Sequence, residues 1–179
     1  MDSNRIIEIG GNQMEFYYRL FEDNTFCVTS YKGNETHVVI PTTMKISILF
    51  DDLFKGHSEI ISVSIPDTVT DIGGFVFDGC TNLKEIKLPP NLINLWQYAM
   101  TRCGIESITI PGSVPSIVPF TFNQCKDLRE VYVNEGTNKI CAWAFKDCTS
   151  LKTVYLPQSL TNISKDAFEG CEDVRLRYY

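Results

Sequence analysis

Several common functional signatures are missing from the 179 residues of this chain. No apolar run approaches the roughly 20 residues needed to span a bilayer. Lys and Arg form no cluster of the kind that binds nucleic-acid phosphates, and the net charge is −6. The sequence contains no G-x-S-x-G, glycine-rich phosphate loop or H-E-x-x-H motif. These absences argue against membrane insertion, nucleic-acid binding and the hydrolase types that those motifs mark.

Signals for export and for metal binding are also missing. The N-terminus, MDSNRIIEIGGNQMEF, lacks the apolar stretch of a signal peptide. None of the seven cysteines forms the C-x₂₋₄-C pair that zinc sites use. We therefore expect a cytoplasmic protein with reduced cysteines and with no metal or cofactor. The alternative is a cell-surface or secreted protein from which a signal has been removed.

Candidate catalytic side chains are few. Histidine occurs only twice, and His57 falls at a cysteine position of the repeat described below, so we interpret it as a core or edge substitute. His37 is expected in a turn. Spacing alone leaves Glu85 and Glu130 open as a carboxylate pair for glycoside hydrolysis, although both fit solvated strand residues equally well. We therefore expect no enzyme activity.

The sequence does contain an internal repeat of 22 or 23 residues. The stretch Ile60–Leu83, IISVSIPDTVTDIGGFVFDGCTNL, fits again when it starts at Leu83, Ile105, Leu128 or Leu151. Five cysteines keep the same step: Cys80, Cys103, Cys125, Cys148 and Cys171. A period of this length predicts a leucine-rich solenoid, because one such unit cannot bury its apolar side alone.

Each repeat begins with a short alternation of apolar and polar residues, as around Val63 and Ile65, which predicts a strand with one buried face. Proline then ends the strand in most repeats. The remainder is an irregular or short helical return segment. It is anchored inward by the column Phe77, Met100, Phe122, Phe145 and Phe168.

These patterns predict a β-rich solenoid of about five to six coils, with a parallel sheet on one face. Residues 38–179 form the solenoid as one continuous domain, and residues 1–37 do not follow the repeat. Within 1–37, Phe16–Phe21 and Thr25–Tyr31 are expected to form a β-hairpin around a turn at 22–24. The hairpin would cap the open first coil.

The repeats resemble the BspA-like leucine-rich repeat family. The likeness rests on IPDTVTDIGGFVFDGCTNL (65–83), LPPNLINLWQYAMTRC (88–103), IPGSVPSIVPFTFNQCKDL (110–128) and LPQSLTNISKDAFEGCEDV (156–174). The resemblance implies a solenoid fold and, for many members, adhesion at a cell surface. This sequence departs from the pattern at Met100, where Phe is usual, and at Asn134, where proline is usual.

Two rows of side chains are candidate binding surfaces for an unknown protein or glycan partner. The outer sheet face is expected to present Glu85, Lys87, Glu130, Tyr132, Thr153 and Tyr155. The second row, on the return side, is Phe75, Tyr98, Phe120 and Trp143. Tyrosine favours binding surfaces, but each row is also explained by mutual stacking.

We therefore expect a non-catalytic protein that binds a partner through its sheet face. The family resemblance implies that this binding would be adhesion at a cell surface. The alternative is a cytoplasmic structural subunit or inhibitor that docks on one protein. A carbohydrate-binding or carbohydrate-active protein is a more remote alternative. The last segment, 174–179, is expected to form an open edge strand through which a homodimer could assemble.

Overall fold

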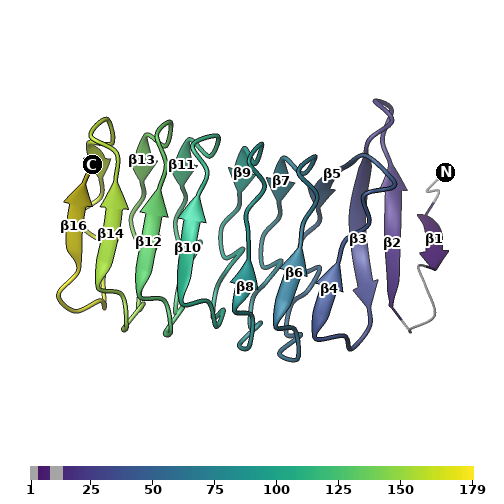
Figure 1. Cartoon of the computed structure of the whole chain (residues 1–179), viewed down its shortest axis with the longest axis horizontal. Coiled ribbons are helices and arrows are strands. Elements are labelled where there is room, and N and C mark those ends of the chain that lie inside the picture. Colours follow the sequence, from purple (N-terminus) through teal and green to yellow (C-terminus); the bar gives the residue numbers. More distant parts are fainter. Residues whose placement is uncertain (1–3, 9–13) are drawn as a thin grey trace.

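The structure is a computed structural model that describes residues 4–8 and 14–179. Its strands follow one another along the long axis, with β1 and β16 at opposite ends (Figure 1). The chain winds as a β-solenoid, which confirms the predicted fold class, but with about seven turns rather than the predicted five to six. The strands of its first face are β4 (His37–Val39), β6 (Ser62–Ser64), β8 (Glu85–Ile86), β10 (Ser107–Ile110), β12 (Glu130–Val133), β14 (Thr153–Leu156) and β16 (Arg175–Tyr178).

The first face is parallel and in register, so equivalent repeat positions lie side by side. Val131 pairs with Ile108 on one side and with Val154 on the other. Val131 and Val154 are fully buried, as are Phe77, Met100, Phe122 and Phe145 of the anchor column, while Phe168 is partly buried. Phe54, also fully buried, extends the column by one coil toward the N-terminal end. Met100 fills the position of a Phe in that column without becoming exposed. The apolar column of the sequence is therefore the continuous core.

The return segments contain short strands rather than helix in the described part of the chain. These strands form the second face, which lies behind the first in Figure 1. Its members are β5 (Ile46–Leu49), β7 (Asp71–Ile72), β9 (Asn94–Leu95), β11 (Ser116–Ile117), β13 (Lys139–Ile140) and β15 (Asn162–Ile163). Each following turn has residues with positive φ, such as Phe75 at 59° and Gly79 at 78°, which a right-handed helix does not accommodate.

The cysteine column joins successive coils through hydrogen bonds. The Cys103 thiol donates to the Phe77 carbonyl at 3.0 Å, and that carbonyl also accepts the Cys80 amide of its own turn. The same thiol contact recurs at Cys80, Cys125, Cys148 and Cys171 with distances of 2.9–3.1 Å. A small buried donor is therefore useful once per coil, and none of the seven cysteines is in a disulfide.

Strand pairing is interrupted at one junction, between the third and fourth coils. At the junctions on either side of it, one backbone carbonyl accepts hydrogen bonds from two amides of the next coil. The Ile61 carbonyl, for example, accepts those of Lys84 and Glu85. Within residues 14–179 no such bonds join β8 to β10, or β9 to β11. At this junction the repeat shortens to 22 residues. Pro115 also has no backbone N–H to donate, whereas Asn138, at the equivalent position one coil later, donates its N–H to the Pro115 carbonyl.

The N-terminal segment contains an antiparallel β-hairpin. Strands β2 (Glu15–Leu20) and β3 (Phe26–Lys32) pair with each other antiparallel, and β3 also pairs in parallel with β5. A further strand, β1 (Asn4–Glu8), pairs with β2 and was not anticipated from the sequence. Phe16, Tyr18 and Val28 are buried against the solenoid core. Tyr31 packs edge-on against Phe54, with ring centroids 5.1 Å apart, and so covers the first anchor.

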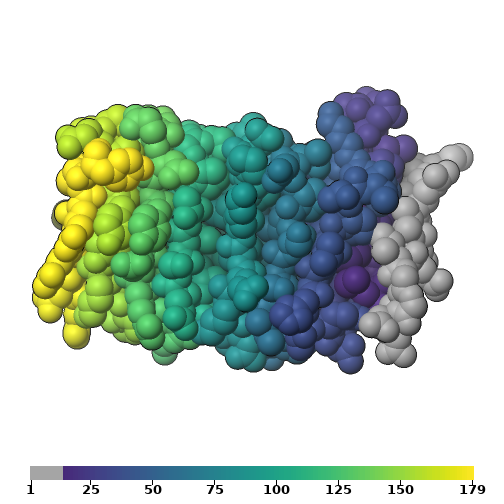
Figure 2. All heavy atoms as spheres, in the orientation of Figure 1, coloured from purple at the N-terminus to yellow at the C-terminus, as the bar shows by residue number. Residues whose placement is uncertain are grey.

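At the other end, β16 is the edge strand of its sheet. Leu176 and Tyr178 pair with the buried residues Val154 and Leu156, yet they are 39% and 49% exposed. The strand lies open at the yellow end of Figure 2. Association of two copies through this edge stays a prediction.

The cap can be tested with one matched pair of substitutions in β2. Phe16→Ala should lower the free energy of unfolding by about 3–5 kcal/mol, because Phe16 is fully buried. Leu20→Ala, at a side chain that is 52% exposed, should change it by about 0.5 kcal/mol or less. Urea unfolding followed by circular dichroism measures both. Equal effects would contradict the capping role.

The cysteine column leads to a second prediction. Burial raises the pKa of Cys80 to about 12 and of Cys27 to about 11, and it also raises those of Cys103 and Cys125. Since the thiolate is the reactive species, these cysteines should react slowly with a thiol reagent at pH 8. Cys141 is half-buried and outside the column, so it should react first, and Cys141→Ser should remove that fast phase. Without reductant, all seven should react after denaturation; fewer would indicate disulfides.

Candidate functional site

The predicted sheet-face residues lie on one side of the first face but in two groups. Glu130, Tyr132, Thr153 and Tyr155 are neighbours, since Glu130 pairs with Thr153 and Tyr132 with Tyr155. Glu85 belongs to the other sheet, β4-β6-β8, which ends at the interrupted junction, and Lys87 directly follows its last strand. The structure therefore brings together four of the six residues.

Tyr132 and Tyr155 form the centre of the first group. Their rings stack with centroids 4.6 Å apart and an interplanar angle of 3°. The Tyr132 hydroxyl donates to the Glu130 carboxylate at 2.9 Å, and the Tyr155 hydroxyl lies 3.5 Å from its other oxygen. The hydrogen bond to Glu130 raises the pKa of Tyr132. Both phenols are thus held in one orientation while Tyr132 remains 37% exposed.

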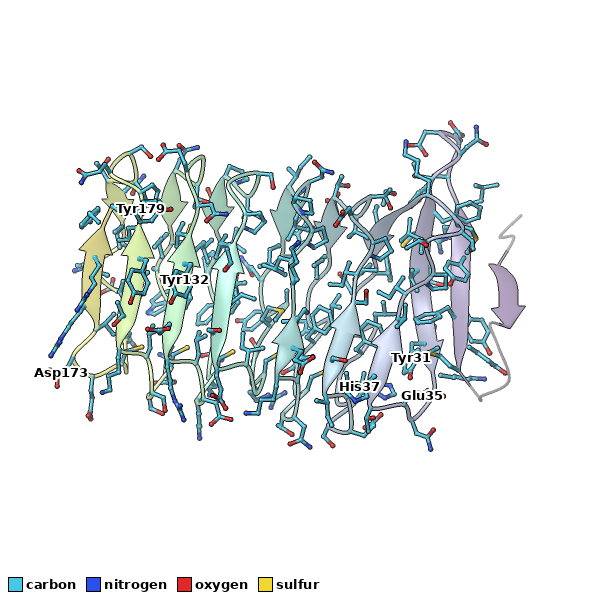
Figure 3. The ribbon with its side chains drawn as sticks, viewed as in Figure 1. Tyr31, Glu35, His37, Tyr132, Asp173 and Tyr179 are labelled. Atoms are coloured by element: carbon cyan, nitrogen blue, oxygen red, sulfur yellow. The ribbon has the colours of Figure 1, made fainter. Side chains whose placement is uncertain are left out.

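Residues of the last strand extend this group. Arg175 pairs with Thr153 and Arg177 with Tyr155, so both arginines continue the outer face. Tyr179 was not singled out from the sequence; its hydroxyl donates to the Val133 carbonyl at 2.9 Å, two coils back. Figure 3 shows Tyr132 and Tyr179 toward the same end of the molecule. We call Glu130, Tyr132, Thr153, Tyr155 and Arg177 the tyrosine patch.

The return-side row is a continuous stack. The ring centroids of Phe75, Tyr98, Phe120 and Trp143 follow one another at 4.8, 5.0 and 5.4 Å. Lys55 Nζ lies 4.7 Å from the Phe75 centroid at one end, and the Trp143 indole donates to Glu169 at the other. Trp143 is 38% exposed, and the other three residues of the row are half-buried. Most ring faces are therefore already covered.

All four residues of this row adopt a left-handed backbone, with φ between 59° and 62°. A bulky side chain in that region costs about 1–2 kcal/mol relative to glycine. Ring stacking and partial burial offset this cost. The stacked rings of this row therefore help to stabilise a left-handed turn residue in four successive coils.

The two histidines lie near the N-terminal end. The prediction of a turn at His37 is wrong, because it is the first residue of β4 and its Nδ1 lies 2.7 Å from Ser62 Oγ. His57 is half-buried at its cysteine position, beside Glu59 at 2.6 Å and edge-on to Tyr31. No cluster of metal-binding side chains occurs within the described residues. That same part of the chain holds no helix long and apolar enough to cross a membrane.

The repeat geometry agrees with the comparisons to known proteins. The chain belongs to the BspA type leucine rich repeat family, which it matches in six copies over residues 47–175. A comparison with curated protein sequences gives no significant match.

Solved structures of bacterial leucine-rich repeat proteins share the fold. The T. pallidum leucine rich repeat protein is 27% identical with a TM-score of 0.75, covering 90% of this chain and 82% of that one. A leucine rich cell surface protein of Faecalibacterium prausnitzii is 25% identical with a TM-score of 0.63, covering 99% of this chain and 55% of that one. A leucine-rich repeat protein of Bacteroides ovatus is 24% identical with a TM-score of 0.66, covering 95% of this chain and 53% of that one, and it supports the fold alone. The chain thus spans about half of the latter two.

The left-handed backbone of the return-side row predicts that Gly will be more stable than Ala as a replacement there, which is the reverse of the usual order. At Phe120, Gly should be more stable than Ala by about 1 kcal/mol, because Ala keeps the strain and Gly does not. At the buried anchor Phe122, whose φ is ordinary, Ala should be the more stable replacement. Urea unfolding of the four variants measures both differences. The same order at both positions would contradict the strain argument.

Proposed function

We propose that this chain is a non-catalytic binding protein that contacts a protein partner through the tyrosine patch. The observation that carries the proposal is the Tyr132–Tyr155 stack, fixed by Glu130 and open to solvent. Rigid tyrosines lose little side-chain entropy on binding and offer both area and hydrogen bonds. The flanking arginines add donors of the kind enriched in protein interfaces.

The position of the patch supports the proposal further. Its residues project from paired strands, so partner contacts would not have to order a loop first. The competing return-side row offers mainly ring edges, because its faces cover one another. We therefore place the partner on the first face, at β12, β14 and β16.

A role at a cell surface is the second candidate. It is favoured by the likeness to the leucine rich cell surface protein of Faecalibacterium prausnitzii. The other version is a cytoplasmic subunit or inhibitor that docks on one protein. Fractionation of the native cell, with detection of the endogenous protein, separates the two versions.

The patch is tested with a partner identified by cross-linking in the native cell and then purified. Tyr132→Ala combined with Tyr155→Ala should weaken its binding by about 2 kcal/mol or more, roughly thirtyfold. The control combines Ser62→Ala with Ser64→Ala on β6, a strand of the first face outside the tyrosine patch, and it should leave the affinity unchanged. Calorimetric titration measures both, and circular dichroism checks folding.

The result that would overturn the proposal is also defined. If the folded double-tyrosine variant binds as tightly as the parent protein, the patch is not the partner site. Loss of affinity in Phe120→Ser with Trp143→Ser instead would place the partner on the return side.

A further inference from the structure

Among the described residues, the junction between the third and fourth coils lacks the backbone hydrogen bonds that recur on both faces. At the other junctions, the residue after each second-face strand donates its amide to the preceding coil, as Trp96 and Cys141 do. Val118 occupies this position at the interrupted junction, and its amide makes no such bond within residues 14–179. On the first face, the Ser107 amide likewise lacks the bond that Glu130 makes one coil later.

The third side of the two coils is still joined. This side is the turn column, formed by the turns after the second-face strands, here residues 96–103 and 118–125. The Met100 amide donates to the Thr121 carbonyl at 2.9 Å, and the Cys125 thiol donates to the Met100 carbonyl at 2.9 Å. The rings of Tyr98 and Phe120 stack with centroids 5.0 Å apart. The two coils are therefore fastened along the turn column, where backbone, thiol and ring contacts continue.

A shortcut in the chain accounts for this asymmetry. Two residues separate the column cysteine from the next repeat in the neighbouring units, whereas Gly104 alone follows Cys103. The Gly104 amide donates to the Cys80 carbonyl at 3.1 Å. A Cβ on Gly104 would collide with the Thr81 carbonyl, so this close approach requires glycine. The start of the fourth coil is thus drawn tightly onto the third at the end of the turn.

The first face opens away from this tight corner. A hollow of about 400 Å³ lies between strands β8 and β10, lined by residues between Ile86 and Pro90 on one side and between Ser107 and Pro111 on the other. The break between these two strands is visible in Figure 1. The junction is therefore a wedge, closed at the turn column and open at the first face.

The apolar core still crosses the junction, and this limits how far the wedge can open. Leu88 and Leu95 on one side, and Ile108 and Ile117 on the other, are at most 4% exposed. Uncovering them would cost free energy in proportion to the apolar area exposed. A wide separation of the two halves is therefore unfavourable, whereas a small rotation keeps these side chains covered.

Two side-chain hydrogen bonds bridge the open sides. Ser113 Oγ donates to the Pro90 carbonyl at 2.8 Å, and Lys84 Nζ donates to the Gly104 carbonyl at 2.6 Å. Both donor residues are exposed, so water can replace either partner when the faces move apart. These bonds therefore permit rotation at the junction.

We propose that this junction is a hinge whose fixed side is the turn column. It lets the block of residues 105–179 rotate by a small angle relative to the block of residues 14–103. The rotation changes the angle between the two halves of the first face, and hence between the tyrosine patch and the surface around Glu85 and Lys87. The hinge does not depend on the function proposed for that patch.

Residual dipolar couplings of the backbone amides test the hinge in the full chain. A lanthanide-binding peptide inserted in the turn at 22–24 aligns the first block in a magnetic field. The couplings average over motions up to milliseconds, which includes the timescale of hinge motions. The alignment tensor fitted to residues 105–179 should therefore be smaller in magnitude, beyond the fitting error, than the tensor fitted to residues 14–103. As an internal control, residues 105–127 and 128–150 should share one tensor.

Two variants restore the regular junction. Replacing Gly104 with Thr-Ser, the pair that follows Cys148, returns the repeat to 23 residues and should make the two tensors equal. Pro115→Asn supplies the donor that Asn138 has one coil later, and it should reduce the difference between the tensors. Tyr132→Ala, on β12, is the control and should leave the difference unchanged. Circular dichroism checks that each variant is folded.

Two results would overturn the hinge. Equal tensors for the two blocks of the parent protein would mean that the junction is open but rigid. A difference that persists unchanged in both folded variants would mean that neither the shortcut at Gly104 nor the missing donor at Pro115 creates the motion.

Discussion

The structure depends on in-register stacking of each coil on the next. No coil of 22 or 23 residues can bury its own apolar side, so every anchor needs a neighbour on both sides. The carbonyl of Phe77 illustrates the coupling, because it accepts an amide from its own turn and a thiol from the following coil. The hairpin provides the missing neighbour at one end, where Tyr31 packs on Phe54.

Both candidate surfaces are consequences of this register. When equivalent positions align, a repeated aromatic becomes a stack, as at Tyr132 and Tyr155 and along the row from Phe75 to Trp143. Function in such a fold is therefore set by one residue per coil at a few outward positions. The tyrosine patch and the return-side row use two different positions of the repeat.

Much of this fold could be predicted from the sequence, because the repeat aligns residues without knowledge of the coordinates. The cysteine step placed the core column, and alternation placed Tyr132 beside Tyr155. The interruption at the fourth coil was not predicted, since it depends on hydrogen bonds that Pro115 and the shortened turn remove.

The most direct test of the account is native-state hydrogen exchange resolved to single amides. If hydrogen-bonded stacking between coils holds the solenoid together, the amides of Glu130 and Thr153, which bond to the preceding coil, should be protected. The equivalent amide of Ser107, at the interrupted junction, should exchange about a hundredfold faster or more. Uniform protection across all three positions would contradict the account, because it would mean that this junction is closed like the others.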